Sequence, residues 1–165
     1  MKHTRILSTG SYVPSNIVDN AAMEKLVDTS DEWIKSRTGI ERRHISIDEN
    51  TSDLAYKAAT AALDKAAVKP ENVELIIVAT VTGDYLFPGV SQLLQKRLGC
   101  KNIPAFDINA ACTGFVYALE IADKMMASGT YSNALIIGAE ILSKLTDYED
   151  RNTCVLFGDG AGAFL

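Results

Sequence analysis

Long apolar runs and a basic excess are both missing from this chain of 165 residues. The longest apolar run, Leu75–Val81, is interrupted by Thr80 and is far shorter than the roughly 18 residues of a membrane-spanning helix. The 16 Lys and Arg are outnumbered by 21 Asp and Glu, which gives a formal net charge of −5. Nucleic-acid-binding domains usually carry a basic excess. The composition therefore argues against a membrane span and against a general nucleic-acid-binding protein.

Cysteine is scarce, and the spacing of the cysteines shows no pairing pattern. Cys100, Cys112 and Cys154 are odd in number and far apart, and no C-x-x-C occurs. This pattern argues against a disulfide framework and against a zinc site. The first residues contain no apolar signal region. We therefore expect a cytoplasmic, reducing location and no metal site.

Glycine and proline are also few, with 11 and 4 residues and no period, which excludes collagen-like and low-complexity chains. A hydrophobic fraction of 47% with 22% charged residues excludes disorder as the main state. A chain of this length is expected to form one domain, here residues 1–165, with a substantial buried core.

Apolar strands alternate with amphipathic helices along the chain. Predicted strands cover 5–9, where Gly10-Ser11 ends the strand, then 73–81, 105–108 and 134–141. A further strand starts at 153–157 and continues in the glycine-rich end. Residues 14–20 are predicted as a turn and linker. The predicted helices cover 52–67, 90–98 and 111–128. This order predicts an α/β fold with a mostly parallel sheet.

The segment Asp107–Phe115 combines a buried strand, a tight Ala-Ala-Cys turn and the start of a long helix. Cys112 would lie near a helix N-terminus, where unpaired N–H groups and the helix dipole lower the pKa of a thiol. Such a thiolate is a nucleophile, and the N–H groups can bind an oxyanion that develops on a thioester carbonyl. Gly114 would let the helix start pack closely on the sheet. The alternative is a small buried apolar residue, the usual role of a free cysteine and our interpretation of Cys100 and Cys154.

A second candidate site lies on a predicted helix that Thr29 or Ser30 caps and Gly39 ends. Trp33, the only tryptophan, and Arg37 are four residues apart and share one face of this helix. An aromatic ring and a guanidinium group can hold a planar base such as adenine between them. Packing of Trp33 in the core is the alternative.

Basic residues concentrate in the same region, where Lys35, Arg37, Arg42 and Arg43 fall within nine positions. A site for a phosphorylated ligand and an ordinary solvated face are both compatible with this cluster. The two histidines, His3 and His44, lie in a terminal strand and after two arginines, and neither is interpreted as a general base.

The glycine-rich end, Gly158–Ala163, matches the relaxed dinucleotide pattern G-x-G-x-x-A. That pattern requires a helix that opens at the glycines and an acidic residue about 20 positions later. Neither is present in this sequence. The segment is therefore predicted to be a strand that closely approaches another element.

Several separated motifs together resemble one family, β-ketoacyl-acyl-carrier-protein synthase III of the thiolase superfamily. The resemblance is carried by Gly10–Pro14, Thr29–Ile40, Asp107–Phe115, Arg151–Thr153 and Gly158–Ala163. It extends from Arg5 to Leu165. It implies a thiolase-like half, with a mixed, mostly parallel five-stranded sheet packed between helices.

The resemblance also implies roles for individual residues. Cys112 resembles the nucleophile that accepts an acyl group from acyl-CoA, and its own N–H would form part of the oxyanion hole. Trp33 and Arg151 resemble the pair that stacks on the adenine of CoA. Arg37 and Thr29 resemble nearby contacts to the nucleotide and its phosphates.

The acyl pocket is the third implied feature. Phe87, Leu142 and Phe157 resemble residues that shape it, with Phe87 reaching across the interface of a homodimer. The implied reaction is a decarboxylative Claisen condensation that starts fatty-acid synthesis. A short acyl-CoA, for which acetyl-CoA is favoured, primes the cysteine, and malonyl-acyl-carrier protein supplies the carbanion. No metal or redox cofactor takes part.

The family's chain is about twice as long, and its catalytic His and Asn lie in the second half, for which no residue here is a match. The sequence is thus predicted to be an N-terminal half that holds the acylation cysteine but cannot complete condensation alone. Two alternatives stay open. One is a related thiolase-superfamily acyltransferase of a secondary pathway, and the other is a non-catalytic half that acts as a dimerising module.

Overall fold

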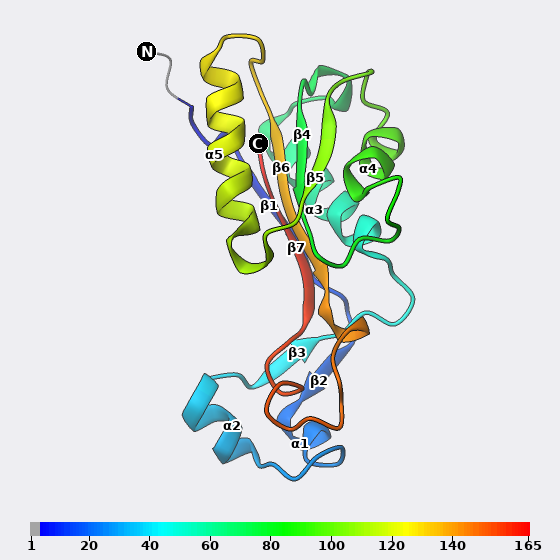
Figure 1. The fold of residues 1–165 in the computed structure, drawn as a ribbon, viewed down its shortest axis with the longest axis vertical. Helices are drawn as coiled ribbons and strands as arrows, with labels where there is room; N and C mark the ends of the chain where they lie inside the picture. Colours follow the sequence, from blue (N-terminus) through cyan, green and yellow to red (C-terminus); the bar gives the residue numbers. More distant parts are fainter. Residues whose placement is uncertain (1–3) are drawn as a thin grey trace. The chain divides into compact units, whose positions relative to one another are not determined.

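The computed structural model describes residues 4–165, and Figure 1 shows the order of the elements along the chain. His3 lies outside the described residues. The chain divides into two compact units. Unit 1 consists of the described residues up to Tyr12 together with Asn50–Glu140 and Ala161–Leu165. Unit 2 consists of Val13–Glu49 and Ile141–Gly160.

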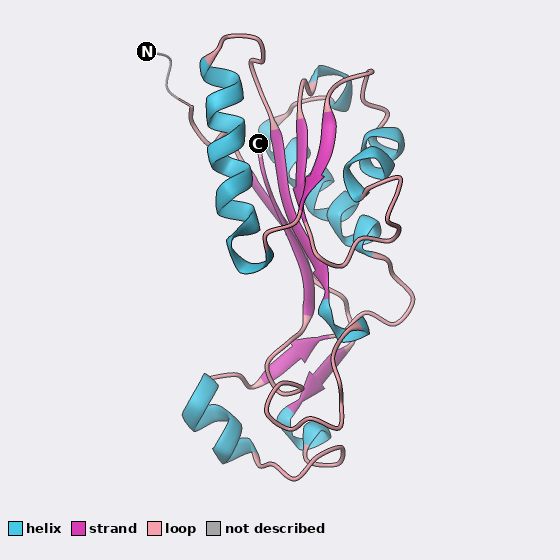
Figure 2. Cartoon of the chain, viewed as in Figure 1, coloured by secondary structure: helices cyan, strands magenta, loops and turns pink. Residues whose placement is uncertain are grey.

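The strands, drawn in magenta in Figure 2, form two sheets, and the larger one has five strands in the order β1-β7-β6-β4-β5. Strand β4 is parallel to both β5 and β6, whereas β1 is antiparallel to β7. The mixed five-stranded sheet with a parallel centre confirms the predicted α/β class. Its strands are β1 (Thr9–Tyr12), β4 (Ile76–Ala79), β5 (Ala105–Ile108), β6 (Leu135–Ile141) and β7 (Asp159–Phe164).

Both faces of this sheet are covered by helices, as Figure 1 shows for α5 on one face and for α3 and α4 on the other. Successive side chains of β4 serve the two faces in turn. Ile76 and Val78 belong to the core cluster beneath α3 and α4, and Ile77 and Ala79 belong to the cluster beneath α5. A strand that is buried on both faces has a continuous apolar sequence, and this is why β4 could be predicted from the sequence. The helices are α3 (Thr51–Ala66), α4 (Val90–Leu98) and α5 (Gly114–Ala127), with short 3-10 turns η1 (Pro70–Asn72) and η2 (Ala111–Thr113).

Strand β1 lies directly against α3, and Gly10 makes this approach possible. A Cβ at Gly10 would lie 2.5 Å from the backbone nitrogen of Ala62 and still closer to the carbonyl oxygen of Ala58. The predicted strand over 5–9 is therefore wrong, because the strand begins at Thr9 and continues through Gly10. The glycine serves a close backbone approach, whereas the sequence predicted that it ends the strand.

Unit 2 is built around a small two-stranded sheet. Val18 of β2 lies opposite Arg43 of the antiparallel β3. Its buried apolar residues are Met23, Ile34, Cys154 and Val155. The elements are β2 (Ile17–Asp19), α1 (Asn20–Met23), α2 (Asp31–Thr38), β3 (Arg42–His44) and the 3-10 turn η3 (Leu142–Lys144).

Two predictions fail in this unit. Residues 14–20, expected to be a turn and linker, contain β2. The strand expected to start at 153–157 is a series of turns, in which the Cys154 N–H donates to the Asp150 carbonyl at 3.0 Å. Cys154 is buried in the apolar core of unit 2. The next strand, β7, begins only at Asp159.

Candidate active site

Cys112 lies in the turn that joins β5 to α5 in unit 1, and its side chain is exposed. The preceding residue, Ala111, has a φ of 45°, which is a left-handed conformation that residues other than glycine adopt at a cost. Strained backbone of this kind concentrates at functional sites. The long helix begins at Gly114, three residues after the predicted start, because η2 precedes it.

The N–H groups of this turn differ in their partners. The Thr113 N–H donates to the Ala110 carbonyl at 3.2 Å, and the Gly114 N–H donates to the Ala111 carbonyl. For the Cys112 N–H, no acceptor is found within residues 4–165. A free backbone donor beside a thiol is what an oxyanion hole requires.

The start of α5 packs closely on the sheet. A Cβ at Gly114 would lie 3.2 Å from the Ala79 Cβ, and one at Gly138 would lie 3.2 Å from the Phe115 ring. Glycine at both positions lets the helix that follows Cys112 sit deep against β4 and β6. This agrees with the interpretation of Gly114 from the sequence.

Phe87 belongs to a loop of the same unit, and its side chain is 84% exposed. Its neighbours Tyr85 and Leu86 are exposed too. Large apolar side chains that gather at a loop tip are uncommon on the surface of a monomeric protein.

Three carboxylates accept the hydrogen bonds that fix this loop and its two ends. Glu140 of β6 accepts hydrogen bonds from the Val81 N–H at 2.8 Å and from the Thr82 hydroxyl. Asp84 accepts from the Ser52 N–H at 2.9 Å, at the start of α3. The roles of Glu140 and Asp84 could not be predicted from the sequence, because their partners lie 32 to 59 positions away in the chain.

Asp107 is the third carboxylate, and it caps α4 from the neighbouring strand. It accepts from the Val90 N–H at 2.6 Å and from the Ser91 N–H at 2.8 Å. Gly89 precedes the helix and has no side chain to cap it. A carboxylate next to an apolar strand end is a signal that the sequence does contain, and it could have suggested this role.

Trp33, Arg37 and Arg151 form one cluster in unit 2. The guanidinium carbons of Arg37 and Arg151 lie 4.6 Å and 5.0 Å from the centroid of the Trp33 ring. Arg151 also pairs with Asp28 at 3.5 Å. The three residues come from two segments that are over 100 positions apart, so the structure brings together what the sequence could only place separately.

Helix α2 positions this cluster, and both of its predicted ends are confirmed. The Ser30 hydroxyl caps it by accepting from the Trp33 N–H at 3.1 Å, and Gly39 ends it with a φ of 72°. The hydroxyl oxygen of Thr29 is buried and has no hydrogen-bond partner among the described residues. A buried hydroxyl without a partner is costly unless a ligand satisfies it.

The basic residues within 35–43, which suggested a site for a phosphorylated ligand, have different roles in the structure. Lys35 pairs with Asp31 at 3.0 Å and with Glu41 at 3.6 Å, and the hydrogen bond that Lys35 donates to Asp31 raises the Lys35 pKa. Arg43 is buried, donates to the Val155 carbonyl at 2.8 Å, and has its pKa lowered by burial. Arg37 covers Trp33, so the stretch is not one uniform basic face.

Leu142 and Phe157 also lie in unit 2. Leu142 begins η3 and is half-buried, while Phe157 is 40% exposed and lies two positions before β7. Cys112 and Phe87, the other two members of the predicted acyl site, belong to unit 1.

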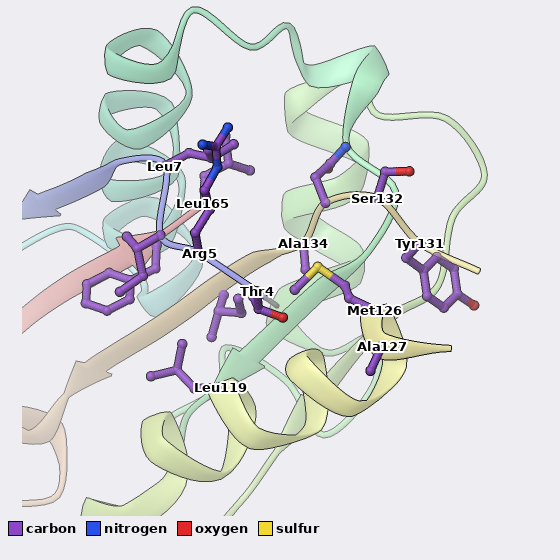
Figure 3. Close-up of a pocket in the computed structure, with 14 residues that line it drawn as sticks. Thr4, Arg5, Leu7, Leu119, Met126, Ala127, Tyr131, Ser132, Ala134 and Leu165 are labelled. Carbon is purple, nitrogen blue, oxygen red and sulfur yellow. The ribbon is translucent and has the colours of Figure 1, made fainter. Parts of the chain in front are cut away.

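A cavity of about 370 Å³ is lined from α5 by Leu119, Met126 and Ala127 (Figure 3). Its walls are mostly apolar and include Leu7, Leu119, Met126 and Leu165, and none of the predicted site residues lines it. Within the described residues, no group of three or more potential metal-binding side chains occurs. No helix there is long and apolar enough to cross a membrane.

Comparison with known proteins shows which proteins this chain resembles in sequence and in fold. A family model for 3-oxoacyl-[acyl-carrier-protein (ACP)] synthase III matches residues 106–165. A β-ketoacyl-[acyl-carrier-protein] synthase III from Clostridium acetobutylicum is 55% identical over 165 residues, which are 100% of this chain and 51% of that protein. The chain thus spans about half the length of the curated relatives that it matches.

Solved structures agree with this relationship. The crystal structure of a 3-oxoacyl-[acyl-carrier-protein] synthase III from Aquifex aeolicus has a TM-score of 0.95 and 52% identity, and the match covers 97% of this chain and 52% of that one. The priming β-ketosynthase of the R1128 polyketide pathway has a TM-score of 0.94 and 38% identity, with 97% and 48% covered.

Proposed function

The chain corresponds to the N-terminal half of 3-oxoacyl-[acyl-carrier-protein] synthases III, and on this premise we propose that it carries the acyl-transfer step of such an enzyme. The observation that supports this most directly is Cys112. It is an exposed thiol in a strand-to-helix turn, it follows a residue of positive φ, and its own N–H has no partner within residues 4–165.

In the proposed step, the Cys112 sulfur attacks the carbonyl carbon of an acyl-CoA thioester. A new carbon–sulfur bond forms, the bond to the CoA sulfur breaks, and the thiol proton leaves with CoA. The Cys112 N–H, which has no partner within residues 4–165, is proposed to stabilise the charge on the carbonyl oxygen. Exchange of one thioester for another conserves electrons, so it needs no redox cofactor.

The nucleotide of CoA is proposed to bind at Trp33, Arg37 and Arg151. A planar base can stack on the indole ring beside a guanidinium group, and the unpartnered Thr29 hydroxyl offers a hydrogen bond to it. Leu142, Phe157 and Phe87 are proposed to shape the acyl pocket. Acetyl-CoA is the favoured primer.

For the whole protein, we extend the proposal to condensation with malonyl-acyl-carrier protein, which starts fatty-acid synthesis. Loss of carbon dioxide from the malonyl group gives a carbanion that attacks the carbonyl carbon of the acyl-cysteine. A carbon–carbon bond forms, the bond to the Cys112 sulfur breaks, and the 3-oxoacyl-carrier product leaves while Cys112 returns as the free thiol. The exposed apolar tip at Phe87 supports a homodimer. A cytoplasmic location is proposed because the chemistry needs a free thiol at Cys112.

The proposal is tested by intact-mass spectrometry of the protein after incubation with acetyl-CoA. An acetyl adduct is expected, and it should disappear in Cys112→Ala. Cys100→Ala is the matched control, because it also removes one thiol but should keep the adduct. A protein that takes up no acetyl group, or one that keeps it in Cys112→Ala, would show that Cys112 is not the nucleophile.

A second candidate function is priming of a secondary pathway by another acyl group, which the likeness to the R1128 priming β-ketosynthase supports. The same assay with branched and aromatic acyl-CoAs separates the two. Faster acylation by those substrates than by acetyl-CoA would favour the second candidate.

A further inference from the structure

Asp159 is a buried carboxylate in unit 2 that the proposed acyl transfer does not use. Only 6% of its surface is exposed. It accepts hydrogen bonds from the Ser46 N–H at 2.6 Å, from the Ser143 N–H at 2.9 Å and from the Ser143 hydroxyl at 2.7 Å. A buried carboxylate must have such partners, and hydrogen bonds to an ionised acceptor are stronger than those between neutral groups.

These three bonds join segments that are far apart in the sequence. Ser46 follows β3, Ser143 lies in η3, and Asp159 opens β7. The adjacent Gly158 adds a second point of contact, because a Cβ there would lie 3.2 Å from the His44 carbonyl oxygen. The end of β3 and the start of β7 are therefore held together at two successive positions.

The same bonds fix two residues of the proposed acyl pocket. Leu142 immediately precedes Ser143, whose N–H and hydroxyl both bind Asp159. Phe157 lies two positions before Asp159 in the same chain segment. The Asp159 side chain thus fixes the backbone next to both Leu142 and Phe157, although neither of these residues makes a hydrogen bond to it.

This arrangement also explains the glycine-rich motif Gly158–Ala163, for which the sequence alone indicated no function. The residues after Gly158 form strand β7, with no helix to receive a nucleotide phosphate. The motif therefore combines a close backbone approach at Gly158 with a buried acceptor at Asp159.

We propose that Asp159 is a positioning residue that holds Leu142 and Phe157 in a fixed relation and thereby sets which acyl chains are transferred. This inference rests on the proposed function, because it takes Leu142 and Phe157 as walls of the acyl pocket. It adds a residue that touches no substrate and acts through two that do.

The test uses this protein, with Asp159→Asn and Ser143→Ala as variants. Asp159→Asn keeps the shape of the side chain but places an amide against the donors. Ser143→Ala removes only the hydroxyl and serves if Asp159→Asn does not fold. Asp53→Asn is the matched control, because Asp53 also accepts a backbone N–H, that of Asn50 at 2.8 Å, but lies in α3 of unit 1.

The first measurement is hydrogen exchange at the Ser46 and Ser143 amides. In Asp159→Asn both should exchange faster by about tenfold or more, since a charge-assisted bond to each is lost. Unchanged exchange at both amides would overturn the inference, whether or not the protein transfers acyl groups.

The second measurement is the rate of acylation by hexanoyl-CoA relative to acetyl-CoA. This ratio should change by about threefold or more in Asp159→Asn, change in the same direction but less in Ser143→Ala, and stay the same in Asp53→Asn. Faster exchange with an unchanged ratio would overturn the positioning role. If the unaltered protein forms no acyl-enzyme, the proposed function is wrong and the role in acyl selection is wrong with it.

Discussion

At the scale of single residues, Ala111 and Ala67 offer a matched pair. Both have positive φ, 45° and 54°, and Ala67 merely caps the end of α3, whereas Ala111 precedes Cys112. Glycine relieves the strain of a left-handed backbone, so Ala111→Gly and Ala67→Gly should each raise the free energy of unfolding by about 0.5–1 kcal/mol. Only Ala111→Gly should slow acylation, because the turn then holds the thiol less firmly.

Urea unfolding and the rate of acetyl-adduct formation check this prediction. The outcome that would contradict it is equal acylation in both variants, which would make the strain at Ala111 irrelevant to the thiol.

The buried thiol of Cys154 leads to a prediction about alkaline pH. Burial raises its pKa, and the nearby Asp150 raises it further. Above the ordinary thiol pKa of about 8.5, the unfolded chain loses this proton while the folded chain keeps it. The folded state then binds more protons, so stability falls as pH rises toward the folded pKa.

We therefore expect Cys154→Val to lose less free energy of unfolding than the parent protein between about pH 8 and pH 10. Tyr148, whose pKa burial also raises, should account for part of the remaining loss. Urea unfolding across this pH range measures the slope, and an identical slope in the variant would refute the assignment to Cys154.

At the scale of elements, the start of α4 depends on Asp107 and Gly89 together. A Cβ at Gly89 would lie 2.5 Å from a carboxylate oxygen of Asp107. Gly89→Ala should therefore destabilise the protein by about 1–3 kcal/mol. Asp107→Ala should cost about 0.5–2 kcal/mol through loss of the helix cap.

The two changes should not add, because Asp107→Ala removes the atom that the new methyl group meets. Thermal or urea unfolding of both single variants and of the double variant measures the coupling. Strict additivity would mean that the backbone at Gly89 has another cause for its sensitivity.

The elements also show how far sequence reasoning reaches. Helix α4 and strand β5 have the predicted bounds, because Gly99 and the apolar run 105–108 are local signals. The predicted strand at 153–157 fails because an apolar run looks the same in a strand and in a buried turn. The hydrogen bonds of Asp159 and Glu140 were beyond prediction, since their partners lie between 16 and 113 positions away.

The candidate site shows the same division. Cys112 and its strand-turn-helix setting follow from residues that are adjacent in the chain. The meeting of Trp33 with Arg151 depends on the fold, so only the resemblance to a family could pair them beforehand.

At the scale of the whole molecule, the relatives are about twice as long as this chain. We expect these 165 residues alone to take an acetyl group at most and to form no 3-oxoacyl product from acetyl-CoA and malonyl-acyl-carrier protein. Carbanion formation needs donors that stabilise an enolate-like charge. Among the described residues, the one histidine is His44, whose Nδ1 lies 2.6 Å from the Pro14 carbonyl oxygen.

Product formation by the 165-residue chain, measured beside the Clostridium acetobutylicum β-ketoacyl-[acyl-carrier-protein] synthase III, decides this prediction. Turnover that persists after host synthase is removed would contradict it.

Trp33 is the sole tryptophan, and it lies in helix α2 of unit 2 with the Arg151 guanidinium group over its ring. Indole emission from this protein therefore has a single origin. A fluorescence titration with CoA reports occupancy at that ring without any label. During denaturation the same emission follows unit 2, whereas far-ultraviolet circular dichroism is dominated by the long helices of unit 1. Superimposed transitions from the two signals would mean that the units unfold as one cooperative body, and separated transitions would give each unit a stability of its own.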